Sequence, residues 1–449
     1  MLKPQYLFDA LIVLSALMLF PSHATARDWF VAAGGTGNGT ERSPFGLVQA
    51  ALDAAQPGDT IRVRTGTYKE AIRTVRHGSA GAPITIRADE VSGPVLMTIR
   101  GTVLQIDHSF IAVEKIIFDA AYAPRNAVRI SHGAQSIVLR GVQVRRSSRD
   151  CVDIGAAVNV LVEGALIHRC LNPADGRTDA HGLVASAVRG LTIRRTEIHT
   201  FSGDAIQLNR TGTRYAPGWD DVVIEQCRFW LAPLAETENG FPAGTVTGEN
   251  ALDTKVDSAS PRARITIRDT EAWGFGGGLI RLQAAFNLKE KIDARVDRVT
   301  VWDSEIAFRV RGDGSGHNGA WVQIQNAVLH DVAIAVRYED DIERLRVWNS
   351  TFGSGVGRAF VAAQSKSSRP DVRNTVVLGS TLPQEAAGES NRAVGDKAFV
   401  NASAHDYRPT AYSPAVDSGI ALQDVGTDRA GVRRPQGRAY DAGAYELKP

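Results

Sequence analysis

Three charged residues, Asp253, Lys255 and Arg281, are the ones that residue type and spacing mark most clearly for chemistry. Asp253 and Lys255 lie in segment 248–255, and Arg281 lies in segment 277–283; both segments alternate apolar and polar residues. Alternation at period 2 predicts half-buried strands whose polar residues point outward. An amine, a guanidinium and a carboxylate on one such face could remove a proton from a carbon acid and neutralise the charge that develops.

These two strands belong to a repeat that occupies the middle of the chain. Equivalent apolar residues recur along the chain, and the shortest intervals between them are 22 or 23 residues. The longer intervals are the same unit with an insertion. Because so small a unit cannot bury its apolar face alone, successive units must stack and share a core. The pattern predicts an all-β protein, a parallel β-helix solenoid. The marker residues are Leu139, Leu161, Ile193, Ile224, Ile267, Val301, Ile324 and Val347.

A second strand in each unit places charged residues in ladders along one face. One predicted ladder runs through Asp153, Val184, Gln207, Asp253, Arg281, Arg309 and Arg337. The next, two residues on, includes Asn209, Lys255, Gln283 and Arg311. Stacked like charges repel, and an acidic ligand would offset that cost if its carboxylates were bound by Gln207, Arg309, Arg311 and Arg337. A solvated face with arginines splayed into water is the alternative.

The two ends of the chain differ from the repeat. Residues 1–26 form a predicted signal peptide, with Lys3, an apolar run over 10–20 and an Ala24-Thr25-Ala26 cleavage site. Residues 27–80 are predicted to form a strand and a capping helix that starts at Pro44 with Ser43 as its N-cap. Residues 81–380 hold the coils, and residues 381–449 form a turn-rich closing segment. We therefore expect a secreted or periplasmic protein without a membrane span after signal cleavage.

The amino-acid composition limits which partners and which type of scaffold are expected. The formal net charge is +2, which gives no reason to expect nucleic acid. Three cysteines leave at least one thiol free, so the fold is not a disulfide-built scaffold. We expect a monomer.

Segments near both ends of the chain resemble those of a known family. They are Trp29–Ala32, Ala54–Ile61, Gly66–Tyr68 and 82–87 near the start, and Ser413–Asp417 and Asp441–Glu446 near the end. They resemble the start and the closing segment of secreted right-handed parallel β-helix proteins of the polysaccharide-lyase kind, including pectate lyases. The resemblance covers most of the mature chain and implies a right-handed solenoid with an N-terminal capping helix.

Residues 249–255 with 278–281 resemble the catalytic coils of the alginate lyase and chondroitinase B family. The resemblance implies that Lys255 is the base, that Arg281 on the next coil assists it, and that Asp253 orients either residue or binds a cation. Two departures are visible: Arg281 registers beside Asp253 rather than Lys255, and no histidine follows it. A calcium site, where present, would draw on Glu249, Asp253 and Asp257.

The predicted function is cleavage of a uronic-acid-containing glycan by β-elimination. The carboxylate next to the acidic carbon must be neutralised, a base must take the proton, and an acid must protonate the leaving oxygen. Candidates for that acid are Tyr338, His317 and His181. Asp150, His181 and Asp204 begin neighbouring second strands, where aspartate is more typical of a turn.

Three other functions stay open on the same scaffold. They are a glycoside hydrolase of the polygalacturonase kind, whose clustered carboxylates are not evident, a C5-epimerase, and a non-catalytic glycan-binding protein. Trp302 and Trp348 are predicted on the first-strand ladder, where sugar rings could stack on them.

Overall fold

The structure is a computed structural model that describes residues 26–89, 93–173, 179–209, 218–313, 319–363 and 368–448. Residues 1–25, which carry most of the predicted signal peptide, and His317 lie outside the described residues. Among the described residues, no helix has both the length and the apolar character needed to cross a membrane.

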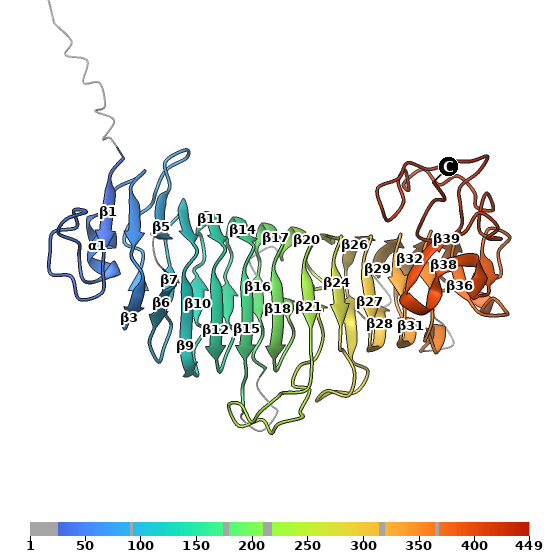
Figure 1. The fold of residues 1–449 in the computed structure, drawn as a ribbon, viewed down its shortest axis with the longest axis horizontal. Coiled ribbons are helices and arrows are strands. Elements are labelled where there is room, and N and C mark those ends of the chain that lie inside the picture. The colour runs from blue at the N-terminus through green and yellow to red at the C-terminus, as the bar shows by residue number, and fades with distance from the viewer. Residues whose placement is uncertain are drawn as a thin grey trace, which may run out of the picture.

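The chain winds into a parallel β-helix, which confirms the predicted all-β solenoid (Figure 1). Each complete coil contributes one strand to each of three parallel sheets, here called sheets 1, 2 and 3 in the order that a coil visits them. Sheet 1 contains β1 (Asp28–Val31), β2 (Thr60–Val63), β5 (Ile84–Ala88), β8 (Ile111–Glu114), β11 (Gln135–Arg140), β14 (Val158–Glu163), β17 (Arg189–Arg194), β20 (Asp220–Glu225), β23 (Ala263–Arg268), β26 (Ile292–Asp297), β29 (Ala320–Gln325), β32 (Ile342–Trp348) and β35 (Asp371–Arg373).

Sheets 2 and 3 complete each coil. Sheet 2 contains β3 (Gly66–Tyr68), β6 (Val95–Thr98), β9 (Ile117–Ala123), β12 (Gln143–Ser147), β15 (Leu166–Cys170), β18 (Glu197–Phe201), β21 (Arg228–Trp230), β24 (Glu271–Trp273), β27 (Thr300–Trp302), β30 (Val328–Leu329), β33 (Thr351–Phe352), β36 (Val376–Leu378) and β37 (Arg392–Val394). Sheet 3 contains β4 (Ile72–Arg73), β7 (Leu104–Ile106), β10 (Val128–Ile130), β13 (Val152–Ile154), β16 (Leu183–Ser186), β19 (Ile206–Asn209), β22 (Leu252–Thr254), β25 (Ala284–Lys289), β28 (Ser304–Arg311), β31 (Val332–Tyr338) and β34 (Arg358–Ala362).

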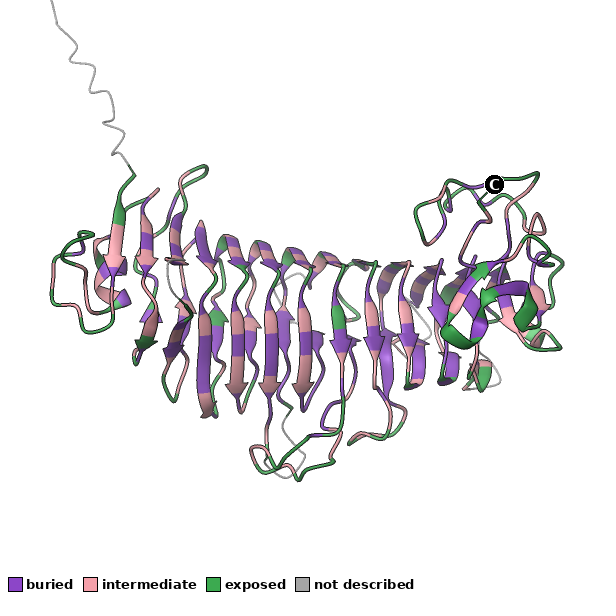
Figure 2. Ribbon diagram, in the orientation of Figure 1, coloured by how far each residue is buried: buried purple, intermediate pink, exposed green. Residues whose placement is uncertain are grey.

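The core is a continuous apolar column inside the coils, to which buried residues of most strands contribute (Figure 2). In β23, for example, Ile265 and Ile267 are buried, whereas Thr266 and Arg268 face outward. Stacked coils therefore share one core, as the repeat predicts. A disulfide joins Cys151 to Cys170, and Cys227 is free and buried.

Two marker residues of the repeat were misplaced. Val296 of β26, not Val301, pairs in the first-strand ladder with Ile267 and Ile324. Val301 lies in β27 of sheet 2, beside Ala272. Both segments alternate, so the period alone could not tell which strand of the coil came first. Leu161 is likewise one residue off, because Val162 pairs with Leu139.

A short helix, α1 (Val48–Ala54), lies at the N-terminal end of the solenoid (Figure 1). It begins later than predicted, and Ser43 does not cap it. The carboxylate of Glu70 accepts hydrogen bonds from the backbone N–H groups of Val48 (2.8 Å) and Gln49 (3.1 Å). A distant acidic side chain therefore satisfies the helix N-terminus.

The C-terminal segment packs at the other end of the solenoid (Figure 1) and forms a small core with Val328 and Val376 of the last coils. It contains the 3₁₀ turns η1 (Gln384–Ala386), η2 (Asp396–Ala398) and η3 (Ala402–Ala404), and the antiparallel pair β38 (Phe399–Asn401) and β39 (Asp406–Pro409). Within it, Arg434 and Glu446 form a fully buried ion pair of 2.7 Å.

Candidate active site

The predicted charged ladder exists on the outer face of sheet 3, with one member exchanged. Successive strands pair Asp153 with Val184, then Gln207, then Asp253. On the far side of Asp253 the ladder continues through Asn287, Arg309 and Arg337. Stacking of equivalent coil positions therefore brings together residues that are far apart in the sequence.

Arg281 is not in this ladder, and its predicted place beside Asp253 is wrong. It is exposed in the loop between β24 and β25. Leu282 adopts a positive φ of 57°, and the side chain of Gln283 accepts from the N–H of Gly278 (3.0 Å) and donates to the carbonyl of Gly248 (3.0 Å). These contacts close the loop, so the strand begins only at Ala284.

Asn287 and Lys289 occupy the positions that sequence reasoning gave to Arg281 and Gln283. Asn287 is the direct partner of Asp253. Two residues on, the backbone N–H of Lys289 donates to Thr254 Oγ1 (2.8 Å). The signal was available, because 286–289 alternates as apolar, polar, apolar, polar, but the alternating segment 280–283 just before it hid that pattern.

Asp253 is the buried centre of the cluster. Its side chain lies 2.8 Å from Lys289 Nζ and 3.5 Å from Lys255 Nζ, and it accepts a hydrogen bond of 2.9 Å from Asn287 Nδ2. Asp253 and Lys289 are buried, whereas the Lys255 side chain is 32% exposed. One carboxylate thus holds two ammonium groups in place, and only Lys255 has a substantial exposed surface.

Gln207 connects Lys255 to a buried histidine. Lys255 Nζ donates to Gln207 Oε1, and the Nε2 atoms of Gln207 and His181 lie 2.7 Å apart. His181 Nδ1 accepts a hydrogen bond of 2.8 Å from the backbone N–H of Asp204. Burial lowers the pKa of His181, which favours the neutral ring. The polar chain runs His181, Gln207, Lys255, and Asp253 holds its far end.

Two acidic residues beside this chain are shifted toward their protonated forms. Burial, reinforced by the charge of Asp253, raises the pKa of Asp204 to about 8. Burial and then the charges of Asp204, Asp179 and Asp253 raise the pKa of Glu249 to about 8. Asp204 is buried and accepts from Asn250 Nδ2 (2.8 Å), whereas Glu249 is only half-buried. Glu249 is therefore a partly accessible proton donor at neutral pH.

A groove of about 960 Å³ lies beside the cluster, over β13, β16 and β19. An insertion between β21 and β22 forms part of its wall, and Figure 1 shows this insertion projecting from the solenoid. Glu238 in the insertion contacts Arg169 (2.9 Å), and Asn239 donates to Ser148 Oγ (2.9 Å). The groove is lined by residues that include Arg100, Arg149, Asp153, Asp179, His181, Gln207, Asn209 and Asn239.

The arginines on the other side of Asp253 are partly neutralised. Arg309 Nε (2.8 Å) and Arg337 Nε (3.1 Å) both contact Glu339 Oε1, so two cations share one carboxylate. Arg311 follows Lys289 on its ladder. Its buried Nε atom has no hydrogen-bond partner among the described residues. Arg309 and Arg337 thus bring two positive charges to one carboxylate.

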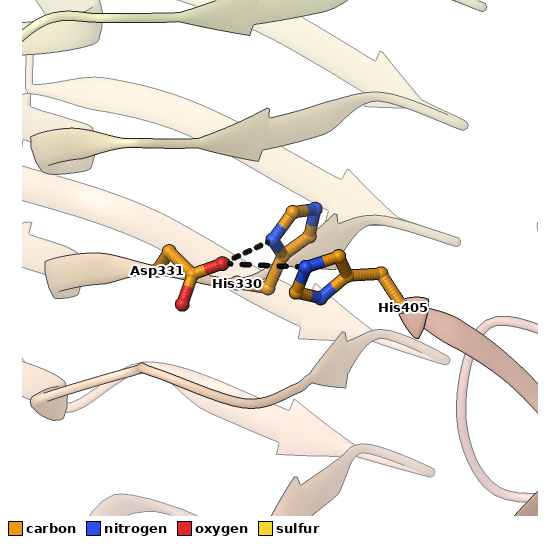
Figure 3. Close-up of side chains that lie close together, drawn as sticks. All are labelled: His330, Asp331 and His405. Atoms are coloured by element: carbon orange, nitrogen blue, oxygen red, sulfur yellow. Dashed lines mark hydrogen bonds and ion pairs between the residues drawn. The ribbon is translucent and has the colours of Figure 1, made fainter. Parts of the chain in front are cut away.

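The acidic residues predicted to bind calcium do not come together as a donor set. Asp257 Oδ1 accepts from the N–H of Ala259 (3.0 Å) in a local turn, and Asp253 faces the two lysines, whose charges oppose a cation. Among the described residues, only His330, Asp331 and His405 form a group of three metal-ligating side chains (Figure 3). Calcium at Glu249, Asp253 and Asp257 stays a prediction that this geometry does not favour.

The other predicted contributors lie elsewhere. Tyr338 is buried, and its hydroxyl donates to Glu385 Oε1 (3.0 Å) at the far end of sheet 3. Trp302 belongs to sheet 2, where Trp273 covers one face of its indole at 4.6 Å and His330 the other at 5.9 Å. Trp348 lies in sheet 1 and is buried. Neither indole offers a free face to a sugar.

Comparison with known proteins agrees with the fold. A sequence profile of the chondroitinase B family matches residues 46–138. The crystal structure of pectate lyase Pel9A superimposes with a TM-score of 0.53 and 16% identity over 94% of this chain and 97% of that chain. A rhamnogalacturonan lyase superimposes with a TM-score of 0.56 and 12% identity over 84% and 91%. No curated protein matches the sequence. This chain is thus a parallel β-helix protein with a fold like that of polysaccharide lyases.

Proposed function

We propose that the protein is a polysaccharide lyase that cleaves a uronic-acid-containing glycan by β-elimination. The observation that carries this proposal is the pair of lysines fixed on the buried Asp253, next to a groove and to the half-buried acid Glu249. A base, a fixed positive charge and a proton donor are the three groups that the reaction needs. The fold similarity is consistent with it.

In this mechanism Lys255, as the free amine, removes the proton from the carbon that bears the uronate carboxylate. The electron pair of that C–H bond moves into the ring as a double bond, and the bond to the leaving glycosidic oxygen breaks. Lys289 and Arg311 neutralise the uronate carboxylate while the charge is delocalised over it. Asp253 positions both lysine side chains, and Gln207, which lines the groove, accepts a hydrogen bond from Lys255 Nζ.

Glu249 gives its proton to the leaving oxygen. It is half-buried, and burial, with the acidic residues around it, raises its pKa to about 8, so it is protonated near neutral pH. The Lys255 ammonium and the Glu249 carboxylate formed by one turnover restore the starting state by passing a proton from the first to the second. Arg309 and Arg337 bind acidic sugars further along the chain. No step requires a metal ion.

The test incubates the purified protein with alginate, pectate and glycosaminoglycans and follows the ultraviolet absorbance of an unsaturated uronate. We expect absorbance to rise on one of these glycans and Lys255→Ala to lower the rate by at least about 100-fold. Lys69→Ala, an exposed lysine in the N-terminal region, is the matched control and should keep the wild-type rate.

Other outcomes contradict the proposal and favour a different function. Shorter products without absorbance indicate a hydrolase, inverted uronate stereochemistry without chain scission indicates a C5-epimerase, and binding without turnover indicates a glycan-binding protein. Full activity in Lys255→Ala would show that Lys255 is not the base.

We also propose export of a monomer that acts outside the cytoplasm. The disulfide between Cys151 and Cys170 is typical of an oxidising compartment. Mass spectrometry of the protein from culture medium or periplasm should give a mature N-terminus at Arg27, and light scattering should give the mass of one chain.

A further inference from the structure

The junction between the coils and the C-terminal segment contains three metal-ligating side chains with no part in the proposed reaction. His330 and Asp331 lie where β30 ends and β31 begins, and His405 follows η3 in the C-terminal segment. Their ligand atoms lie within 4.8 Å of one another (Figure 3). His330 Nδ1 is 2.9 Å and His405 Nε2 is 3.6 Å from Asp331 Oδ2. Ligand atoms around a tetrahedral Zn²⁺ are separated by roughly 3.3 Å, since each lies about 2.0 to 2.1 Å from the metal.

The geometry points to a binding site for Zn²⁺ or a similar divalent transition metal at His330, Asp331 and His405, which ties the C-terminal segment to the solenoid. Two imidazoles and one carboxylate suit zinc, whereas calcium and magnesium prefer oxygen ligands. Asp331 and His405 are exposed, so water can reach the fourth position.

The second nitrogen of His405 is already held, as expected of a metal ligand. Its Nδ1 atom lies 3.2 Å from the Tyr407 hydroxyl and 3.3 Å from Ser354 Oγ. Tyr407 also accepts a hydrogen bond of 2.8 Å from the backbone N–H of Ser354. These contacts direct Nε2 of His405 toward Asp331. His330 is fixed by burial and by stacking on Trp302.

One adjustment accompanies binding. The rings of His330 and His405 stack at 3.9 Å with an angle of 16° between their planes. A nitrogen lone pair lies in its ring plane, so nearly parallel rings cannot both point at one ion. The exposed His405 ring must turn, which changes the contacts of its Nδ1 atom with Tyr407 and Ser354; the side chain, 40% exposed, has room to do so.

The site requires the folded junction. His405 follows His330 by 75 residues, so an unfolded chain does not bring the three ligands together. Zinc that binds only the docked form stabilises it by mass action. The metal would thus strengthen the contact between the C-terminal segment and the last coils.

The test titrates Zn²⁺ into full-length protein that has been stripped with chelator and dialysed, and records stoichiometry and affinity by calorimetry. We expect one equivalent to bind and to raise the thermal midpoint. His405→Asn should weaken binding by more than about 100-fold, because loss of an outer-shell partner alone costs about 10- to 100-fold. Asparagine tolerates the left-handed backbone of residue 405, where φ is 57°, so the metal-free variant should keep the wild-type fold.

Co²⁺ provides a second readout, since a tetrahedral site with nitrogen ligands gives strong visible absorption. That absorption should be lost in His405→Asn and kept in His132→Asn, which changes an exposed histidine elsewhere on the solenoid. Lack of Zn²⁺ binding by the wild type, or equal binding by His405→Asn, overturns the site. The lyase assay is independent of this result.

Discussion

Two faces of the solenoid carry many charged side chains, and they differ in how those charges are matched. On sheet 1, Glu163 lies between Arg140 Nε (2.8 Å) and Arg194 Nε (2.7 Å), and these arginines hold its pKa at about 2. On sheet 3, burial and neighbouring carboxylates raise the pKa values of Asp204 and Glu249 to about 8.

The difference shows that the number of charges does not identify a site. Sheet 1 alternates acids and bases from coil to coil, so its carboxylates are paired with arginines, as Glu225 is with Arg268. Sheet 3 collects several carboxylates around two lysines and covers them with loops. Some of them must hold a proton, which makes this face suited to proton transfer.

The first prediction changes the proposed acid. Glu249→Gln keeps the size of the side chain but cannot donate a proton of comparable acidity, so we expect kcat to fall about 100-fold with little change in KM. The wild-type rate should also fall as pH rises through about 8, where Glu249 loses its proton. Initial rates by ultraviolet absorbance test both. An unchanged rate in Glu249→Gln would show that another residue protonates the leaving oxygen.

The second prediction separates binding from chemistry. Arg309→Gln removes one of the two cations on Glu339, and we expect KM to rise by roughly 10-fold, about 1.4 kcal/mol, with kcat within about twofold. The matched change on sheet 1 is Arg264→Gln, which breaks an exposed pair with Asp220 (2.8 Å) and should leave KM unchanged. Equal effects of both variants would show that general charge, not the sheet 3 ladder, binds the glycan.

The third prediction concerns stability and pH at Asp204. Its pKa is raised in the folded protein, so the folded state holds a proton that the unfolded state releases between pH about 4 and 8. This contribution to stability is lost as pH rises through that window, by at most about 1.4 kcal/mol per pH unit. Urea unfolding at pH 5 and pH 8 should show a smaller pH dependence in Asp204→Asn than in the wild type. Parallel slopes would mean that Asp204 is ionised throughout.

The smallest effect on activity is expected at Glu163. Its pKa is lowered by Arg140 and Arg194, so it stabilises the fold above pH about 4.5, and that contribution is lost as pH falls toward about 2. Glu163→Gln should therefore lower the thermal midpoint at pH 7 and lower it less at pH 3, with kcat and KM within about twofold. A large loss of lyase activity in Glu163→Gln would contradict the assignment of activity to sheet 3 alone.

The solenoid and most of the sheet 3 ladder could be read from alternation and period. Each strand has the same alternation of inward and outward residues, so four predicted members of the ladder occupy equivalent positions: Gln207, Asp253, Arg309 and Arg337. The prediction that Arg281 lies beside Asp253 was wrong because two consecutive segments alternate. Only the closure of the loop by Gln283 shows which of the two segments joins the sheet.

The protonation of the site could not be read from the sequence. Asp204 lies two residues before β19, as aspartates in turns do. Its environment is set by Asn250 and Asp253 from the next coil and by the loops that cover it. Burial of this kind depends on how coils stack, so residue spacing does not reveal it. The metal-ligating group is hidden for the same reason, since His405 meets His330 only when the chain end folds back.

The column of aromatic rings on sheet 2 has an optical consequence. The indoles of Trp230, Trp273 and Trp302 stack with centroids 5.9 and 4.6 Å apart and planes within 10° of parallel. Chromophores this close share their electronic excitations, so their combined near-ultraviolet circular dichroism differs from the sum of three isolated tryptophans. That signal depends on the spacing of adjacent coils, and the solenoid therefore carries a built-in spectroscopic reporter of whether its central turns are wound.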